Sequence, residues 1–102
     1  MNYKEISQYL KVIADSSRLE ILDLLSCGEL CACDLLEHFS FSQPTLSHHM
    51  KVLKDNNLIT SRKDGNKNLY KLNHDVLDDI TSRLTLLSSN TCLLYTSDAA
   101  DE

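Results

Sequence analysis

The sequence predicts a mainly α-helical domain with one small β-hairpin, a winged helix-turn-helix of about five helices and a two-stranded wing. Three observations predict this fold. Apolar residues recur at helical spacing through the first half of the chain. Two short helices there are separated only by Ser40-Phe41-Ser42, the brief connection expected of a helix-turn-helix. Two strand-like segments then flank a turn that contains Gly65.

The first three helices follow from their apolar stripes and their end signals. Ile6, Leu10 and Ile13 form one stripe at helical spacing on the first helix, and the second helix carries Leu19, Leu22 and Leu25 inward. Asp15 or Ser16 can cap the second helix, which should stop at Gly28. A short third helix is expected over residues 31–39, with Leu35, Leu36 and Phe39 as its apolar contacts.

The fourth helix has a well-marked start. Ser42 suits the N-cap position, and Pro44 is tolerated in the first turn. Leu46, Met50 and Leu53 form its apolar stripe, so its outer surface carries polar and basic side chains. This surface holds Gln43, Ser47, His48, Lys51 and Lys54.

A basic hairpin and a last helix complete the predicted domain. Residues 59–63 and 68–72 read as two strands, with Gly65 at a positive-φ position between them. Asn73 can cap a final helix whose stripe is Leu77, Ile80, Leu84 and Leu87. Because that stripe is longer than so small a core needs, part of it, with the first helix, is assigned to a homodimer interface.

Residues 1–90 are therefore expected to form one DNA-binding and dimerisation domain, and residues 91–102 a disordered tail. Residues 95–102 resemble translated adapter sequence at the end of a truncated reading frame, and they are excluded from functional inference. No apolar run approaches the ~18 residues of a membrane span, and no signal-peptide pattern is seen. We expect no membrane partner and a cytoplasmic location, where cysteines stay reduced.

The formal net charge of -5 is unevenly distributed. Residues 43–71 contain six Lys or Arg and two Asp, which gives +4 and leaves -9 for the rest. A basic face on an acidic body can still bind phosphate. No catalytic triad, phosphate loop or cysteine-arginine oxyanion motif is found, so an enzyme is not expected.

Cys31 and Cys33 are the candidate metal ligands. A thiolate pair prefers soft ions, among them As(III), Sb(III), Cd, Pb, Bi, Cu(I) and Zn. If both cysteines lie in the first turn of the third helix, their sulfurs point in nearly opposite directions. Ligation should then distort that helix and disturb the neighbouring DNA-binding helix.

Other uses of the cysteines stay open. Cys27 or Cys92 could supply a third thiolate, but a role other than ligand is favoured for both, and Cys27 at the end of the second helix suits the core. A redox sensor is an alternative of the same fold. Disulfide geometry between residues i and i+2 of a helix is poor, so oxidation is expected to need Cys27 or Cys92 as a partner.

The DNA contacts are predicted from side-chain type and place. Gln43, Ser47 and His48 can reach base edges. Phosphate oxygens suit a second group, made up of Thr45, Lys51, Arg62, Lys63 and Lys67. His49 fits a packed or capping role at least as well as a DNA contact.

Four ordered segments resemble the signatures of the ArsR/SmtB family of metal-responsive winged-helix repressors. They are Asp15-Ser16-Ser17-Arg18-Leu19-Glu20-Ile21-Leu22, Glu29-Leu30-Cys31-Ala32-Cys33-Asp34-Leu35, Leu46-Ser47-His48-His49-Met50-Lys51-Val52-Leu53 and Arg62-Lys63-Asp64-Gly65. The resemblance extends over residues 3–90 and is greatest to arsenical-resistance repressors of staphylococcal plasmids.

This resemblance implies a homodimer that binds operator double-stranded DNA of an arsenic-resistance operon. As(III) or Sb(III) would act as inducer by binding Cys31 and Cys33, with no permanent cofactor. Some relatives have a third cysteine where this chain has Leu36. Cadmium and lead sensors add N-terminal cysteines, and zinc sensors use His and acidic ligands on the last helix, so both are less favoured alternatives here.

Overall fold

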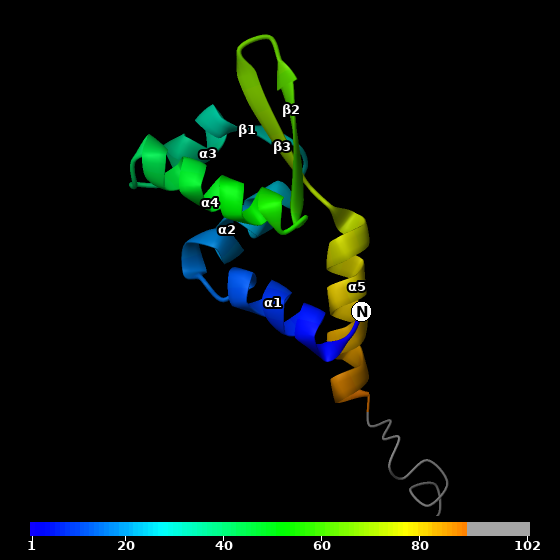
Figure 1. Cartoon of the computed structure of the whole chain (residues 1–102). Coiled ribbons are helices and arrows are strands. Elements are labelled where there is room, and N and C mark those ends of the chain that lie inside the picture. Colours follow the sequence, from blue (N-terminus) through cyan, green and yellow to red (C-terminus); the bar gives the residue numbers. More distant parts are fainter. Residues whose placement is uncertain (90–102) are drawn as a thin grey trace, which may run out of the picture.

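The computed structural model describes residues 1–89, which form five helices and a three-stranded antiparallel sheet (Figure 1). The elements in chain order are α1 (Tyr3–Ile13), α2 (Ser16–Leu25), β1 (Leu30–Cys31), α3 (Ala32–His38), α4 (Gln43–Asp55), β2 (Ile59–Asp64), β3 (Lys67–Leu72) and α5 (His74–Ser88). The predicted winged helix-turn-helix is confirmed.

Side chains at the helix starts explain several boundaries. The Asp15 carboxylate accepts the backbone N–H of Arg18 at 3.0 Å and begins α2. Ser42 is the N-cap of α4, with Pro44 in the first turn, as predicted. Asn73 precedes α5 but forms no side-chain capping bond, so only its position was predicted correctly.

The sheet contains one strand more than the expected hairpin. β2 and β3 pair from Ile59 with Leu72 to Asp64 with Lys67, around Gly65 at φ 63°. The short strand β1 adds to the other edge of β3, which gives the order β1-β3-β2. Its two residues are too few for a strand pattern to be recognised in the sequence.

The core lies between α2, α3, α4 and the base of the sheet. Leu46, Met50 and Leu53 of α4 are buried as predicted. On α2, Leu22 and Leu25 are also buried as predicted, but Leu19 is 54 % exposed and Ile21 is fully buried in its place. Five of the ten residues of α2 are apolar, so more than one stripe has helical spacing, and packing against α4 and β3 buries the side that carries Ile21.

Helix α5 runs down one side of the molecule, and its far half extends beyond the packed body (Figure 1). Ile80 is its one buried residue, whereas Leu84 is 37 % and Leu87 80 % exposed. The predicted surplus of apolar surface on this helix is therefore present. No helix within residues 1–89 is long and apolar enough to cross a membrane. The expectations for residues 91–102, including Cys92, lie outside the described residues.

Candidate thiol site and DNA-binding surface

Cys31 lies before α3, not within its first turn. Its backbone is extended, at φ -84° and ψ 161°, and it is both the last residue of β1 and the N-cap of α3. The predicted helix start at residue 31 was wrong by one residue. The run Cys31-Ala32-Cys33-Asp34 has the spacing of a capping box, and this signal could have placed the cysteine correctly.

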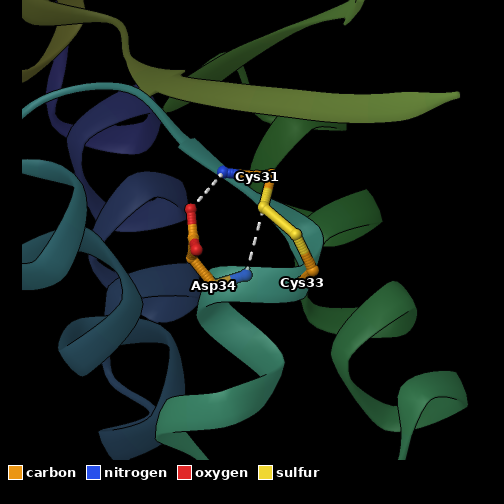
Figure 2. The surroundings of a disulfide bond; sticks show 3 residues. All are labelled: Cys31, Cys33 and Asp34. Carbon is orange, nitrogen blue, oxygen red and sulfur yellow. Dashed lines mark hydrogen bonds between the residues drawn. A yellow bond between two sulfur atoms is a disulfide. The ribbon is translucent and has the colours of Figure 1, made fainter. Parts of the chain in front are cut away.

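This position brings the two sulfurs together. A turn of ~100° per residue applies only to helical residues, so it does not separate an extended Cys31 from Cys33. The structure joins them in a disulfide with the Cα atoms 5.2 Å apart, while α3 remains regular from Ala32 to His38 (Figure 2). The expectations that the sulfurs diverge, and that pairing them requires α3 to unwind, were wrong.

The distance between Cys31 and Cys33 also changes which cysteines are expected to pair on oxidation. A Cα separation of 5.2 Å is within the ordinary range for disulfides, about 4.4–6.8 Å. Cys31 and Cys33 are therefore partners for one another, and oxidation does not need Cys27 or Cys92. Cys27 follows α2, is exposed rather than part of the core, and is absent from the cluster of ligand atoms at the start of α3.

Asp34 completes the local arrangement. Its backbone N–H donates to Cys31 Sγ at 3.2 Å, and its carboxylate accepts the Cys31 N–H at 3.3 Å (Figure 2). The ligand atoms of Cys31, Cys33 and Asp34 lie within 4.8 Å of one another. An N–H directed at sulfur at a helix start favours thiolate over thiol, whereas the nearby carboxylate opposes it.

The sulfur pair borders a cavity of about 290 Å³ that reaches the predicted DNA-reading residues. Three structural parts line it: the start of α3, residues 43–50 of α4 and the hairpin. Its lining residues outside the cysteine pair include Leu36, Gln43, Leu46, Ser47, Met50, Lys67 and Tyr70. Sequence reasoning missed Tyr70, which is half-buried and whose pKa is raised by desolvation.

Two connections tie the thiol segment to the wing. Cys31 pairs with Leu69 and Leu30 with Tyr70, so β1 is hydrogen-bonded along β3. Beside it, the Arg62 guanidinium donates to both carboxylate oxygens of Glu29, at 2.9 and 2.8 Å. This pairing lowers the pKa of Glu29 and raises that of Arg62. Nothing in the sequence spacing connects residues 33 positions apart, and sequence reasoning missed the pair.

Helix α4 presents its predicted polar residues outward. Gln43, Thr45, Ser47, His48 and Lys51 are all exposed. Two of them already have intramolecular partners. The Lys51 ammonium lies 2.8 Å from the Asp55 carboxylate, and Thr45 Oγ1 lies 3.2 Å from Ser42 Oγ.

The hairpin adds the remaining predicted contacts. Arg62, Lys63 and Lys67 are exposed on β2 and β3, the two strands of the hairpin that packs beside α4. Arg62 differs from the others because Glu29 holds its guanidinium. The fold thus groups all eight predicted DNA contacts on one helix and its hairpin.

His49 is part of the packing that fixes α4. Its Nδ1 lies 3.3 Å from Arg18 Nη1, and Arg18 Nε donates to the Val12 carbonyl at 2.7 Å. Its ring also contacts Phe41, with centroids 5.6 Å apart. The expectation of a packed His49 agrees with this arrangement. Arg18 therefore connects the end of α1 and the start of α2 to the middle of α4.

Known proteins share this arrangement in sequence and in structure. Residues 15–61 match the profile of bacterial regulatory proteins of the arsR family. The chain is 70 % identical over 90 residues to an arsenical resistance operon repressor of Staphylococcus aureus, covering 88 % of this chain and 86 % of that repressor. The chain belongs to the arsR family. The resemblance predicted from the four sequence signatures is confirmed.

Further relatives of this arsR-family chain agree. It is 68 % identical over 90 residues to an arsenical resistance operon repressor of Staphylococcus xylosus, covering 88 % of this chain and 86 % of the relative. A solved structure described as a possible transcriptional regulator for arsenical resistance superimposes with a TM-score of 0.69 at 31 % identity. That superposition covers 91 % of this chain and 94 % of the other. Membership of the family makes this protein a DNA-binding regulator.

Proposed function

We propose that this protein represses an arsenic-resistance operon and leaves its operator when As(III) or Sb(III) binds the thiolates of Cys31 and Cys33. The observation that carries the proposal is the position of the two sulfurs. They lie side by side at the junction of α3 with the wing, next to the cavity that Gln43 and Ser47 also line. The staphylococcal relatives named as arsenical resistance operon repressors support the choice of operon.

On the DNA side, α4 supplies the base contacts and the hairpin supplies charge. Gln43, Ser47 and His48 are exposed on α4 and have the donors that base edges require. The phosphate contacts are Thr45, Lys51, Arg62, Lys63 and Lys67. Lys51 must leave Asp55 to reach a phosphate, which costs little because both side chains are exposed.

On the inducer side, the donor set favours thiophilic ions. Two sulfurs are soft donors, and the Asp34 oxygen is a hard one that such ions bind weakly. As(III) and Sb(III) fit this pair, and they displace protons from the reduced thiols without any change of oxidation state. Cadmium and lead sensing is the weaker alternative, because family sensors of these ions add N-terminal cysteines and this sequence has none before Cys27.

The route from thiols to DNA runs through the wing. Because α3 stays intact with the sulfurs together, unwinding of that helix is not the mechanism we propose. Instead, ligation moves Cys31, which is paired with Leu69 in β3, and so shifts the hairpin relative to α4. Next to this position, the pair of Glu29 and Arg62 also links the segment before Cys31 to the hairpin, through β2.

The repressor acts as a homodimer in the cytoplasm, where its operator lies. Leu10 on α1 and Leu84, Leu86 and Leu87 on α5 leave apolar surface exposed. A second copy covering this surface would remove it from water, and a two-fold dimer matches a palindromic operator.

Titration of a fluorescent operator complex with arsenite tests the proposal. The protein is kept reduced, and release is followed by anisotropy. We expect arsenite to release the wild-type protein, and Cys31→Ser and Cys33→Ser proteins to stay bound. Cys27→Ser is the matched control, since this exposed cysteine lies outside the cluster, and it should respond like wild type. Undiminished binding of the reduced wild-type protein in excess arsenite would refute the proposal.

The disulfide itself favours a second function, redox sensing. Two thiols and one hydroperoxide would give the Cys31–Cys33 disulfide, water and an alcohol, or two waters with hydrogen peroxide. Thiol counting and operator release after mild peroxide measure this function directly. Release by peroxide with no effect of arsenite on the reduced protein would establish it in place of inducer binding.

A further inference from the structure

The guanidinium of Arg18 connects α1 to α4, and the proposed function gives this connection no role. Its Nε donates to the Val12 carbonyl in the last turn of α1 at 2.7 Å, and its Nη1 lies 3.3 Å from His49 Nδ1 in the middle of α4. Helix α2, which carries Arg18, lies between these two helices and contacts both (Figure 1). One side chain therefore touches both the helix at the proposed dimer interface and the helix proposed to read DNA.

The contact with Val12 completes the C-terminal end of α1. A helix leaves its last four carbonyls without partners inside the helix, and this end carries partial negative charge. The Ile13 carbonyl accepts the Asp15 N–H at 2.7 Å, and the Val12 carbonyl accepts the Arg18 Nε. A guanidinium suits this place because it supplies both a hydrogen-bond donor and a positive charge.

The contact with His49 ties Arg18 to the position of α4. Every nitrogen of a guanidinium is a donor, so the His49 Nδ1 accepts this hydrogen bond and the proton of the neutral ring is on Nε2. His49 is partly buried, and its ring also contacts Phe41. It directly follows His48, a proposed base contact. A shift of α4 along or about its axis would break the hydrogen bond to Arg18.

The apolar contacts of α4 fix its position less narrowly than this hydrogen bond does. Leu46, Met50 and Leu53 are buried in the core. Burial of apolar surface is non-directional, whereas a hydrogen bond weakens steeply when its angle falls below ~120°. A small slide or rotation of α4 therefore affects the apolar stripe less than it affects the contact with Arg18.

We propose that Arg18 is a positioning residue for operator recognition. It fixes α4 relative to α1 in each copy, and so sets the distance and the angle between the two recognition helices of the dimer. Two-fold dimers of helix-turn-helix proteins bind half-sites separated by whole turns of the duplex, so both α4 helices must fit at once. The proposal rests on the dimer and the DNA contacts proposed above and does not depend on the inducer. Arg18 itself contacts neither bases nor phosphates.

Duplex binding by the reduced protein without inducer tests this role. The probe is a palindromic duplex that the wild-type protein selects from a random pool, and a scrambled duplex of the same length measures non-specific binding. Arg18→Met keeps an unbranched side chain but loses both contacts, so the orientation of α4 that fits both half-sites becomes a smaller part of the population. We expect affinity for the selected duplex to fall at least about tenfold. Affinity for the scrambled duplex should change less than about twofold, because the phosphate contacts are unchanged.

A spacing series gives a readout that a loss of stability alone would not change. One base pair added between the half-sites turns one of them by about 34° around the duplex axis. The wild-type protein should bind the selected spacing at least about tenfold more tightly than the altered one. Arg18→Met should bind the two within about threefold of one another, because its α4 helices are no longer held at one angle. Wild-type discrimination retained by Arg18→Met would overturn the proposal.

Substitutions at the other contact keep the proposal testable if Arg18→Met does not fold. His49→Leu removes the acceptor and should reproduce the loss, whereas His49→Asn offers its Oδ1 in the place of Nδ1 and should bind nearly as tightly as wild type. The double variant should bind no more weakly than the weaker single variant, because both changes break one contact. Additive losses would count against a shared role. Lys11→Met is the charge control, since it removes an exposed positive charge from the same turn of α1, and it should bind like wild type.

The outcomes separate this role from the proposed function. Unchanged binding and spacing preference in Arg18→Met and His49→Leu refute the positioning role and leave the proposed function standing. Failure of the wild-type protein to select any duplex refutes the proposed function. Loss of the dimer in Arg18→Met, measured by analytical ultracentrifugation, would show that Arg18 acts on assembly and would overturn the proposal. Equal losses on the selected and scrambled duplexes would overturn it as well.

Discussion

Substitution of Cys31 by serine or alanine separates its structural role from its chemical role. Cys31 Sγ accepts the Asp34 N–H at 3.2 Å as the N-cap of a seven-residue helix, and the side chain is 5 % exposed. A serine hydroxyl can accept the same hydrogen bond, whereas alanine cannot. Loss of an N-cap side chain costs about 0.5–2 kcal/mol.

We therefore expect Cys31→Ala to be less stable than Cys31→Ser by about 1 kcal/mol. For a domain of this size, that difference lowers the melting temperature by about 4–8 °C. Both variants should lose the arsenite response equally, because neither retains the thiol. Urea and thermal unfolding of the reduced proteins at one protein concentration measure the difference, since dimerisation makes stability depend on concentration.

Two results would refute this reasoning. Equal stability of Cys31→Ala and Cys31→Ser would mean that the sulfur does not cap α3. A retained arsenite response in Cys31→Ser would mean that the second thiolate lies elsewhere. Cys33→Ser and Cys33→Ala form the matched comparison, because Cys33 is exposed and has no capping bond, and they should differ little from one another.

Three further predictions concern the core, the wing and pH. Leu53→Ala removes a fully buried side chain of α4 and should cost about 2–5 kcal/mol of unfolding free energy, measured in urea; a cost below about 1 kcal/mol would contradict the packing described. Lys63→Ala should weaken binding to all DNA sequences alike and reduce the salt dependence of binding by ~1 counterion. Arg62→Ala should do the same and also change the arsenite response, because Arg62 binds Glu29 beside the cysteine pair. Identical arsenite responses of the two variants would contradict a separate role for Arg62. The backbone N–H of Arg18 donates to the Asp15 carboxylate and holds its pKa below the usual 3.8, so the stabilisation from this carboxylate is complete above that value and is lost as pH falls through the lower folded-state pKa. Asp15→Asn can still cap α2 and should be nearly as stable at neutral pH, but it should lack this dependence on acid pH. Urea unfolding of both proteins across the acid pH range measures the difference.

The fold was largely predictable from local signals. Ser42 with Pro44 marked the start of α4, and Gly65 marked the hairpin turn, because each acts through neighbouring backbone atoms. The register of α2 was not predictable in this way, since Leu19 and Ile21 satisfy similar periodicities and only packing selects one. The strand β1 depends on pairing with a segment some 40 residues away.

The sequence predicts which residue types make up the candidate site but not how they lie relative to one another. Soft-donor chemistry predicts Cys31 and Cys33 as the ligand pair, and polar and basic side-chain types predict the eight proposed DNA contacts. The relation between the two sulfurs was predicted incorrectly, because it depends on whether α3 begins at residue 31 or at residue 32. The Glu29 and Arg62 pair and the Tyr70 wall of the cavity come from tertiary contacts that no local spacing reports.

The central claim is that inducer binding acts on the wing through β1 while α3 stays folded. Amide hydrogen exchange of the reduced protein with and without arsenite tests it most directly. We predict unchanged protection of the α3 amides at residues 36–38 and altered protection at Leu69 and Tyr70, where β3 pairs with β1. Loss of protection in α3 with the β3 amides unchanged would contradict the account.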